Sequence, residues 1–312
     1  MTTTTRRKEQ GQGGSSGADD EGFGVVDMAG PMVPQVWKLG DKYWAWVHKA
    51  STQKSYRLFA GDLYETFSWT PWWVIPVVWF PIIAALSLDA LGLAFSSTPL
   101  SPMLLLVATS FEQAQANSSA STAASAASNA PAQATHVSVG TLDTKSFATV
   151  FVLGAVMWTF LEYALHRFLF HILFLPSTAF GKQAHFVLHG QHHKFPMDKG
   201  RLVFPPVAGL MMATPFYLTF HFTMAREVAN ALTAGALVGY VAYDLIHYYL
   251  HHGRPRSKYF LRLKHHHMRH HFKDADRGFG ISSKLWDFPF CTLFPDVAKA
   301  KPSSTRMHVA SN

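Results

Sequence analysis

The sequence predicts an all-α integral membrane protein with about four transmembrane helices and a helical cap on their cytosolic side. Apolar residues make up 48% of the 312 residues and charged residues only 15%, a balance typical of membrane proteins with polar parts. Several long segments carry almost no charge, as helices in a bilayer require. Basic residues also gather on one side of the membrane that these segments define. Together these observations predict the fold class.

Four apolar segments are expected to cross the membrane. The first has no charged residue over about the 20 positions that a helix needs to span a bilayer, and it contains four tryptophans. A short polar corner at Arg226 and Glu227 separates the last two, which are therefore predicted to form a helical hairpin. The four expected spans are residues 68–88, 146–161, 202–225 and 228–243.

Polar stretches complete the predicted organisation. Residues 1–27 have too little apolar surface to fold and are predicted to be a disordered tail without a signal peptide. Residues 28–67 are predicted to form a cytosolic segment that leads into the membrane domain, 68–295, and 296–312 a second disordered tail. An Ala/Ser-rich insertion at about 111–141 is predicted to be luminal and dispensable for chemistry.

Basic residues predict the orientation. Following the chain through four crossings places both termini and the histidine-rich stretches on one side, whereas the other side offers little beyond Lys145 and Arg226. By the positive-inside rule the histidine side is cytosolic. The net charge of +8 comes without any nucleic-acid-reading motif, so membrane lipids are the expected partner and nucleic acid is not. The basic residues assigned to the cytosolic side are Lys182, Lys194, Lys199, Arg201, Arg254, Arg256, Lys258, Arg262 and Lys264.

Histidine is the residue type that points to chemistry. A single cysteine, Cys291, excludes a disulfide framework and a cysteine-rich zinc site, so a metal must be held by nitrogen or oxygen. Of 18 histidines, 15 lie between His166 and His271. Most occur at helical i, i+3 and i+4 spacings that turn two or three imidazoles toward a common point, which suits zinc or iron. Ten candidates are too many for one ion, so two metal ions with open positions are predicted. The candidates are His166, His171, His189, His192, His193, His247, His251, His267, His270 and His271.

Helical geometry leaves some positions open. His166 and His171 are five residues apart, which a regular helix splays by about 140°, so either they serve different metals or the helix is distorted there. His252 is turned about 100° from His251 and is set aside as a ligand. The remaining histidines are not expected to bind metal, and three of them, His48, His136 and His308, are interpreted as surface residues far from the clusters. The other four are His185, His221, His265 and His266.

Two acidic residues and their tyrosine neighbours are candidate supports for the ligands. Asp244 precedes His247 by three residues and is expected to accept its Nδ1 proton, and Tyr243 precedes it by four. Glu162 and Tyr163 precede His166 by four and three residues and are candidates for the same roles there. Together with His252, these four residues are predicted to act beside the metal ligands. The alternative is that the carboxylates simply reach toward the membrane interface.

The histidine segments carry a resemblance. FLEYALHRFLFH (160–171), HGQHHKFPMDKGRLVFPP (189–206), GYVAYDLIHYYLHH (239–252) and HHMRHHFKDADRGFGISSKLWD (266–287) are similar to the fatty acid 2-hydroxylases of the fatty acid hydroxylase/sterol desaturase superfamily. VWKLGDKYWAWVHK (36–49) matches more weakly. The chain looks closest to the short plant and algal form, since no His-Pro-Gly-Gly haem motif of a fused cytochrome b5 domain occurs.

The resemblance implies an endoplasmic reticulum enzyme that uses dioxygen to hydroxylate carbon 2 of the acyl chain of ceramides or very-long-chain fatty acids. It maps the family's metal ligands onto the ten histidines. Iron is the expected metal of the active enzyme, because zinc has no redox chemistry. Zinc could still occupy the same ligands. Electrons are expected from a separate cytochrome b5 and its NADH-dependent reductase.

Two other functions remain open at this point. Histidine clusters do not distinguish hydroxylation from sterol oxidation or acyl desaturation within the same superfamily. A metal transporter or histidine-rich buffer is the alternative of a different class, but it predicts ligands along a pathway inside the spans, whereas these histidines lie at the ends of spans.

Overall fold

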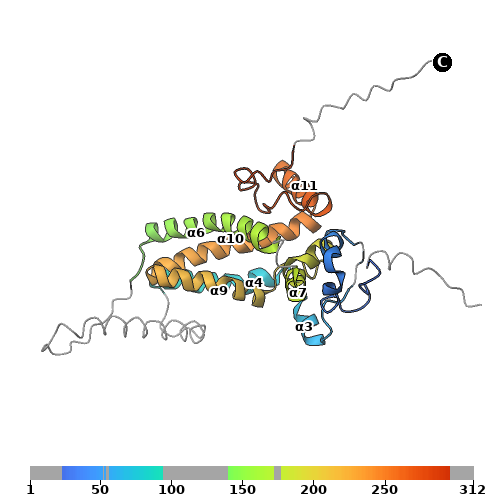
Figure 1. The fold of residues 1–312 in the computed structure, drawn as a ribbon. Helices are drawn as coiled ribbons and strands as arrows, with labels where there is room; N and C mark the ends of the chain where they lie inside the picture. Colours follow the sequence, from blue (N-terminus) through green and yellow to red (C-terminus); the bar gives the residue numbers. More distant parts are fainter. Residues whose placement is uncertain (1–22, 52, 54–55, 94–139, 172–176, 296–312) are drawn as a thin grey trace, which may run out of the picture. The chain divides into compact units, whose positions relative to one another are not determined.

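The computed structural model describes residues 23–51, 53, 56–93, 140–171 and 177–295, and these residues fold into helices joined by short loops (Figure 1). The one β-type contact among them is an isolated bridge between Pro31 and Arg57. The predicted all-α class is confirmed for this part of the chain. The tails expected at 1–27 and 296–312 and the insertion at 111–141 lie almost entirely outside the described residues.

Two helices are long and apolar enough to cross a membrane. Helix α6 (Thr144–Ala164) continues into the π-helix η2 (Leu165–Phe170), and α10 (Arg226–His252) has 27 residues. The first and third expected spans form shorter helices, α4 (Val74–Ala90) and α9 (Pro206–Thr223). Helix α10 begins three residues after the end of α9, which confirms the predicted hairpin corner.

The remaining helices are short, with one exception. Helix α11 has 15 residues and carries three of the candidate ligands, and the others have four to seven residues each. In chain order they are η1 (Val36–Lys42), α2 (Tyr43–Val47), α3 (Asp62–Phe67), α7 (Ala179–His185), the π-helix η4 (Phe186–Gly190), α8 (Gln191–Lys194) and α11 (Lys258–Phe272).

The chain divides into two compact units. The first comprises Met1–Val78, Val156–Met212 and Gly239–Asn312, and the second comprises Trp79–Ala155 and Ala213–Val238. All ten candidate ligands belong to the first unit. The second unit consists of parts of the four apolar helices.

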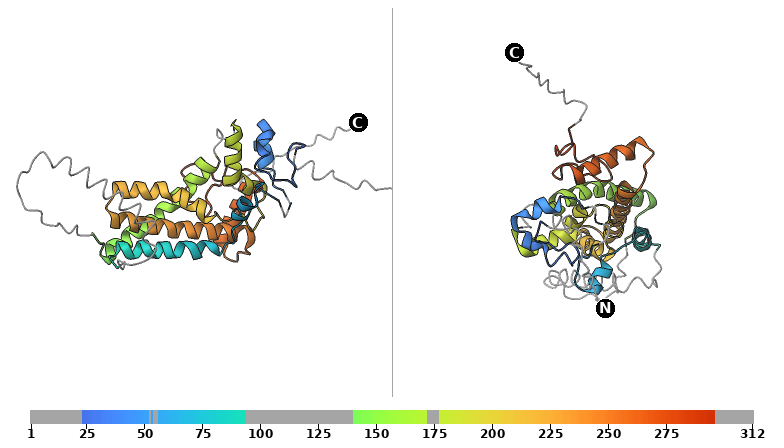
Figure 2. Two further views of the ribbon diagram at one scale, coloured as in Figure 1. Left: turned by 90° about the horizontal axis from the view of Figure 1, so that it is seen from below. Right: turned by 90° about the vertical axis from the view of Figure 1, so that its right-hand side faces the viewer.

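In the second unit, parts of α4, α6, α9 and α10 run alongside one another (Figure 2). Two glycines allow α6 and α10 to approach closely: a Cβ atom on Gly154 would lie 2.1 Å from the carbonyl oxygen of Leu232, and one on Gly235 would lie 1.9 Å from that of Phe151. No side chain fits at either position. Small residues that bring backbones together are typical of helix pairs in membranes.

A polar network also holds the second unit together. The buried Asn230 donates a hydrogen bond to the Asp89 carboxylate over 2.6 Å, and Arg226 forms an ion pair with the same carboxylate over 3.1 Å. The Asn230 side-chain oxygen lies 2.9 Å from Nε2 of His221. Helices α4, α9 and α10 are therefore linked by polar groups that satisfy one another, with Asn230 buried and Asp89 and Arg226 partly exposed.

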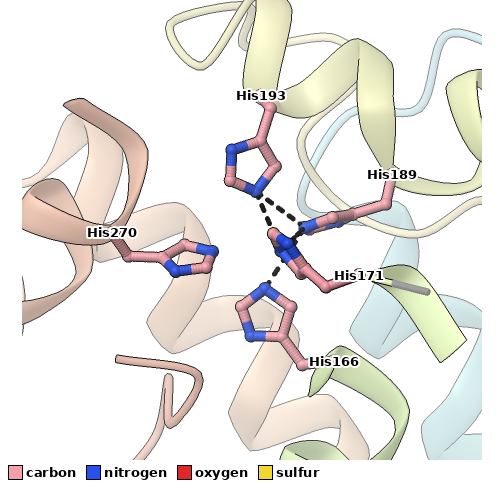
Figure 3. A group of neighbouring side chains, drawn as sticks. All are labelled: His166, His171, His189, His193 and His270. Atoms are coloured by element: carbon pink, nitrogen blue, oxygen red, sulfur yellow. Dashed lines mark hydrogen bonds between the residues drawn. The ribbon is translucent and has the colours of Figure 1, made fainter. Parts of the chain in front are cut away.

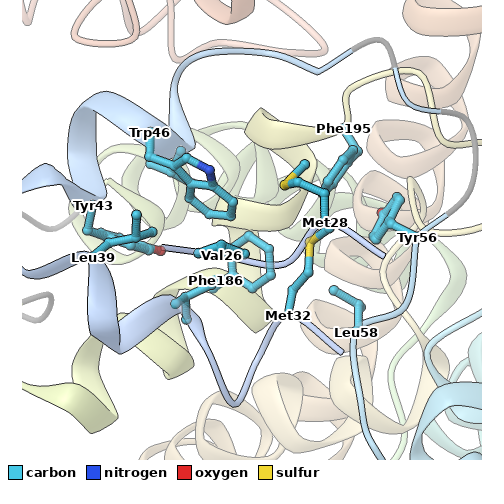
Figure 4. Packing of buried hydrophobic residues seen from close by; sticks show 12 residues of the cluster. Val26, Met28, Met32, Leu39, Tyr43, Trp46, Tyr56, Leu58, Phe186 and Phe195 are labelled. Atoms are coloured by element: carbon cyan, nitrogen blue, oxygen red, sulfur yellow. The ribbon is translucent and has the colours of Figure 1, made fainter. Parts of the chain in front are cut away.

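In the first unit, the N-terminal segment packs around the chain that carries the second histidine motif (Figure 4). Trp46 lies against Phe186, with ring centroids 5.5 Å apart, and Tyr56 stacks on Phe195 at 3.7 Å. Phe186 and Phe195 flank the histidines of η4 and α8 in the sequence. This apolar cluster, which also includes Val26 from the predicted tail, therefore fixes the position of that motif.

Two of the basic residues assigned to the cytosolic surface are buried instead. Lys194 is fully buried, lies over the Trp46 ring at 4.8 Å and donates to the carbonyl oxygen of Lys49. Lys182 is also buried, and its ammonium donates to the carbonyl oxygen of Ser177. Their charges stabilise local structure. The Arg201 side chain is only 10% exposed and is paired with Glu65 and Asp198, so the surface charge comes from the other basic residues.

Candidate metal centre

Ten buried histidines form two compact groups, in each of which the ligand nitrogens lie within 4.8 Å of one another. These are the ten that the sequence singles out, and all come from the first unit. The first group consists of His166, His171, His189, His193 and His270. The second group consists of His192, His247, His251, His267 and His271.

The π-helix η2 explains how His166 and His171 reach the same group. The backbone N–H of His171 donates to the carbonyl oxygen of His166 over 3.2 Å, which is an i→i+5 hydrogen bond. Wider turns of this kind place residues five apart on one face, whereas an α-helix splays them. Of the two explanations left open by the spacing, the distorted helix is the one found. Short π-helical segments occur frequently at functional sites.

Each HxxHH motif is divided between the two groups. In η4 and α8, His189 and His193 belong to the first group and His192 to the second. In α11 the division is reversed, because His267 and His271 belong to the second group and His270 to the first. Residues i and i+4 of a helix share a face, whereas the histidine at i+3 points to one side of that face. The two groups are therefore neighbours that share two helical segments.

The five imidazoles of the first group point toward one another (Figure 3). Hydrogen bonds at the far side of two of these rings define which nitrogen faces the group. His166 donates from Nδ1 to the carbonyl oxygen of Phe279 over 2.6 Å, and His270 donates from Nδ1 to that of Arg277 over 2.8 Å. A carbonyl oxygen can only accept, so both rings carry the proton on Nδ1 and a lone pair on Nε2 in their neutral form. Nε2 of His270 is buried without a hydrogen-bond partner.

The facing nitrogens crowd together. In the first group, Nε2 of His193 lies 3.0 Å from that of His189 and 3.1 Å from that of His171, and His166 and His189 are 3.2 Å apart. In the second group, the Nε2 atoms of His251 and His267 are 2.8 Å apart. Lone pairs at such distances repel unless a proton or cation lies between them. The arrangement suits a cation at the centre of each group.

Burial keeps the imidazoles neutral. Burial lowers the pKa of each candidate ligand outside the membrane-spanning helices well below the ordinary value of 6.5, and neighbouring imidazoles lower it further. Neutral imidazole is the form that binds metal. The histidines with lowered pKa values are His171, His189, His192, His193, His267, His270 and His271.

The donor set fits two metal ions. Five imidazole nitrogens converge in each group, and neither group contains a carboxylate or a thiolate. Imidazole suits zinc, iron, copper and nickel, and excludes calcium and magnesium, which prefer oxygen. The two groups are thus able to hold two transition-metal ions side by side.

Glu162 acts on His166 through an intervening loop, and among the described residues it makes no hydrogen bond to the ring. Its carboxylate accepts hydrogen bonds from the backbone N–H groups of Ile281 and Ser282, over 2.8 and 2.6 Å, and from the Ser282 hydroxyl. This fixes the loop just after Phe279, whose carbonyl oxygen accepts the proton of His166. The expectation that Glu162 would accept this proton itself is wrong, because the backbone occupies that position.

Asp287 anchors the same loop, and the sequence alone did not identify it. Its carboxylate accepts from the backbone N–H groups of Phe279 and Gly280, from Thr292 and from Nε2 of His266. Burial by itself raises the pKa of Asp287, but the hydrogen bonds from His266 and Thr292 outweigh burial and leave this pKa below its ordinary value. The carboxylate therefore stays charged and holds the loop.

Asp244 supports the chain near the second group in a similar way. It accepts from the backbone N–H of Phe204 over 3.1 Å and from the Tyr240 hydroxyl over 3.1 Å, and among the described residues it makes no hydrogen bond to His247. The expected Asp244–His247 hydrogen bond is therefore not found. Tyr243 instead stacks on the His247 ring, with centroids 5.9 Å apart.

The other two residues predicted to act beside the ligands lie at the edge of the centre. Tyr163 lies 3.0 Å from the Thr292 hydroxyl and accepts from Arg167 over 2.8 Å. His252 belongs to neither group, and its ring contacts Tyr248 at 5.0 Å.

A cavity of about 260 Å³ opens beside the two groups. His189 of the first group and His192 and His247 of the second form part of its wall, together with Tyr243 and Asp244. The rest of the wall is mostly apolar. The apolar residues include Leu58, Phe59, Phe67, Phe170, Leu188, Val203, Phe204, Val207, Ala208 and Met211.

His48 was interpreted as a distant surface residue, and this is wrong. Its ring lies 5.0 Å from that of His193 and 6.0 Å from that of His171, and its Nε2 atom is buried without a partner. Its Nδ1 atom is hydrogen-bonded to the carbonyl oxygen of Trp44. Sequence spacing gives no sign of this, because the contact spans more than a hundred residues. A Trp and a His four residues apart on one helical turn are the only local signal.

The remaining histidines in the described chain lie outside both groups. His185 makes a 2.6 Å hydrogen bond with Tyr43, His221 contacts Asn230, and His266 contacts Asp287. His265 is exposed. His136 and His308 lie outside the described residues.

The known proteins that are similar to this chain agree with one another in family. Residues 151–292 match the Fatty acid hydroxylase family. Fatty acid 2-hydroxylase of Mus musculus is 38% identical over 278 residues, which are 89% of this chain and 67% of the mouse protein. The dihydroceramide fatty acyl 2-hydroxylase FAH2 of Arabidopsis thaliana is 36% identical over 282 residues, which are 89% of this chain and 98% of the plant protein.

A solved structure agrees. The structure of full-length scs7p, in which only the hydroxylase domain is visible, superposes with a TM-score of 0.69 and 28% sequence identity over 89% of each chain. Relatives this similar, over this much of their length, show that the chain belongs to the fatty acid 2-hydroxylase family.

Proposed function

We propose that this protein hydroxylates carbon 2 of the acyl chain of ceramides or very-long-chain fatty acids. The reaction is R–H + O2 + 2 e⁻ + 2 H⁺ → R–OH + H2O. The observation that carries the proposal is the cavity, whose wall combines imidazoles of both histidine groups with apolar side chains. Such a wall accommodates a hydrocarbon chain beside two metal ions. The names of the relatives point to the same chemistry.

The ten histidines are the proposed metal ligands. Two redox-active ions, iron in the active enzyme, supply the reduction of dioxygen and the insertion of one oxygen atom into a C–H bond, and zinc in the same ligands supplies neither. The protein positions the substrate: the apolar wall excludes water from the acyl chain, and Tyr243 and Asp244 line the cavity next to His247. Glu162 and Tyr163 hold the loop after α11 in place through Ser282 and Thr292, and His252 acts beside the ligands at the end of α10.

The proposed setting is the endoplasmic reticulum membrane, with α4, α6, α9 and α10 as four spans and the metal centre and termini in the cytosol. Exposed apolar side chains on all four helices support the assignment, among them Val77, Phe80, Val152, Met211 and Tyr249. Cytochrome b5 and its NADH-dependent reductase are the proposed source of the two electrons.

Lipid analysis tests the proposed reaction. The chain is expressed in a eukaryotic host that lacks its own fatty acid 2-hydroxylase, and host sphingolipids are measured by mass spectrometry. We expect 2-hydroxyacyl ceramides with the unsubstituted protein and with His265→Ala, which removes an exposed histidine of α11. We expect none with His192→Ala or His270→Ala. Altered sterols or new double bonds without hydroxyacyl ceramides would refute hydroxylation in favour of sterol oxidation or desaturation.

The cavity has a separate test. Ala208→Trp should fill it and lower the yield of hydroxylated ceramide while leaving the metal content unchanged. Ala242→Trp places the same side chain on an exposed position of α10 outside the cavity wall and serves as the control. Equal yields from both variants would contradict the assignment of the cavity as the acyl-chain site.

A further inference from the structure

The reaction proposed above needs two electrons for each hydroxylation, and both histidine groups are buried. A one-electron donor must therefore dock twice in each cycle at a place where the surface comes close to a ligand. We propose that the outer face of α11 is the docking surface for an acidic one-electron haem protein. The inference rests on the proposed function, because it assigns the route by which that reaction receives its electrons.

The charge of residues 245–273 is of one sign. The chain contains no Asp or Glu between Asp244 and Asp274, although it contains seven Lys and Arg residues there. Helix α11 occupies the C-terminal half of this stretch. The surface that it presents attracts an acidic partner over about 10 Å at moderate ionic strength.

The two faces of α11 have different roles. Its buried face carries His267, His270 and His271. Three exposed basic residues, Lys258, Arg262 and Lys273, lie on the opposite side, and we call them the α11 stripe. Arg262 follows Lys258 by four residues, and Lys273 follows Arg262 by eleven, so the three are aligned within about 60° around the helix axis.

The C-terminal end of the stripe lies next to ligands of both groups. Phe272 is 56% exposed, and its ring centroid lies 6.3 Å from that of His271, a member of the second group. The carbonyl oxygen of Arg277, whose side chain is 45% exposed, accepts the Nδ1 proton of His270 in the first group over 2.8 Å. Electron transfer slows steeply with distance, so a donor seated here has short routes to both groups. By contrast, Nδ1 of His166 is hydrogen-bonded to the carbonyl oxygen of Phe279, and Phe279 is buried, so it offers no comparable route from the surface.

An anionic bilayer surface is the other occupant that a basic helix attracts. The position of the stripe favours a protein. A membrane surface delivers no electrons and would gain nothing from an exposed aromatic ring beside a ligand. Small interfaces with an aromatic centre and a charged rim are typical of transient redox partners, in which charge mainly raises the rate of encounter.

Binding to a defined donor tests the proposal. The full chain, in nanodiscs of uncharged lipid, is titrated with the soluble haem domain of cytochrome b5 at low ionic strength. Arg262→Glu with Lys273→Glu should weaken binding by roughly 10-fold or more and slow oxidation of the reduced haem domain to a similar degree. Lys38→Glu with Lys42→Glu reverses the same number of exposed charges on η1 and should leave both unchanged. Added salt should remove the difference.

Three outcomes would overturn the docking assignment. Equal affinity of the two double variants is one. In a second outcome, the α11 double variant no longer binds phosphatidylserine vesicles but keeps its affinity for the haem domain. The stripe would then be a membrane contact. The third is failure of the α11 double variant to hydroxylate lipid with a chemical reductant, because damage to the metal centre would then explain the defect. A failure of the unsubstituted protein to hydroxylate lipid with any reductant would instead refute the proposed function, and the binding comparison would still decide the docking site.

Discussion

His193 and His271 lie with their ring centroids 4.5 Å apart, although they belong to different histidine groups. The contact follows from the division of the two HxxHH motifs, since His192 and His193 are adjacent in α8, as His270 and His271 are in α11. Neighbouring residues on a helix point about 100° apart. Two short helices facing each other can therefore surround two ions at once, and the groups must be close.

Replacing His192 and His193 separately should remove metal from different groups. His193→Ala takes a ligand from the first group and His192→Ala from the second, and each should lower metal affinity at its own site by at least the roughly 10- to 100-fold typical of mutations that disturb a site indirectly. Element analysis with spectroscopy of a cobalt-substituted protein distinguishes the two sites. Identical spectra and equal metal loss from both variants would mean that the groups act as one site.

Glu162→Ala should release the loop that holds His166. Three hydrogen bonds to a buried carboxylate are lost and their donors are left without partners, so we expect the free energy of unfolding to fall by about 1–3 kcal/mol or more. Metal affinity of the first group should fall as well. Thermal unfolding and metal titration measure the two effects. Asp41→Ala, which removes an exposed carboxylate, is the control, and an equally small effect of both changes would show that the loop needs no anchor.

Metal-free protein should lose stability as the pH falls below about 6.5. Burial lowers the pKa of His189, His193 and His267 in the folded state well below the ordinary 6.5, so the unfolded chain binds more protons than the folded chain below this pH. Above pH 7 these residues are neutral in both states and contribute no pH dependence. Acid should release bound metal for the same reason. Denaturant unfolding between pH 8 and 5 gives the slope, and stability that is constant or increases on acidification would contradict it.

Gly154→Leu should separate α6 from α10. A side chain at this position meets the backbone of Leu232, which cannot move aside as a flexible side chain can, so we expect strong destabilisation. Val152→Leu, at an exposed position two residues away, should change little. Thermal unfolding in detergent or nanodiscs compares the two. Similar unfolding temperatures for both variants would rule out the close helix crossing.

The sequence predicted the site better than it predicted what supports the site. The ten histidines that the structure gathers are those selected by spacing and resemblance, because i, i+3 and i+4 intervals already place imidazoles on one face of a helix. The carboxylates were expected beside the nearest histidine in the sequence. In the structure Glu162 and Asp244 accept from backbone N–H groups 40 to 120 residues away, so local spacing gave the wrong partner.

His48 and Asp287 show the same limit more strongly. Neither is near a ligand motif at helical spacing, and only packing of the N-terminal segment and of the loop after α11 brings them to the centre. Lys194 was counted as surface charge because lysine rarely lies buried, yet Trp46 and the carbonyl oxygen of Lys49 accommodate its ammonium inside the first unit.

The sequence by itself determined the helical class, the apolar helices and the set of histidines, since these depend on composition and on periodicity within one segment. Only the tertiary structure decided which five histidines share a group, that a π-helical turn brings His166 and His171 together, and that backbone carbonyl oxygens fix the protonated nitrogen of two ligands. These features depend on distances between segments far apart in the chain. A one-dimensional pattern restricts such distances weakly, because they are set by how the helices pack.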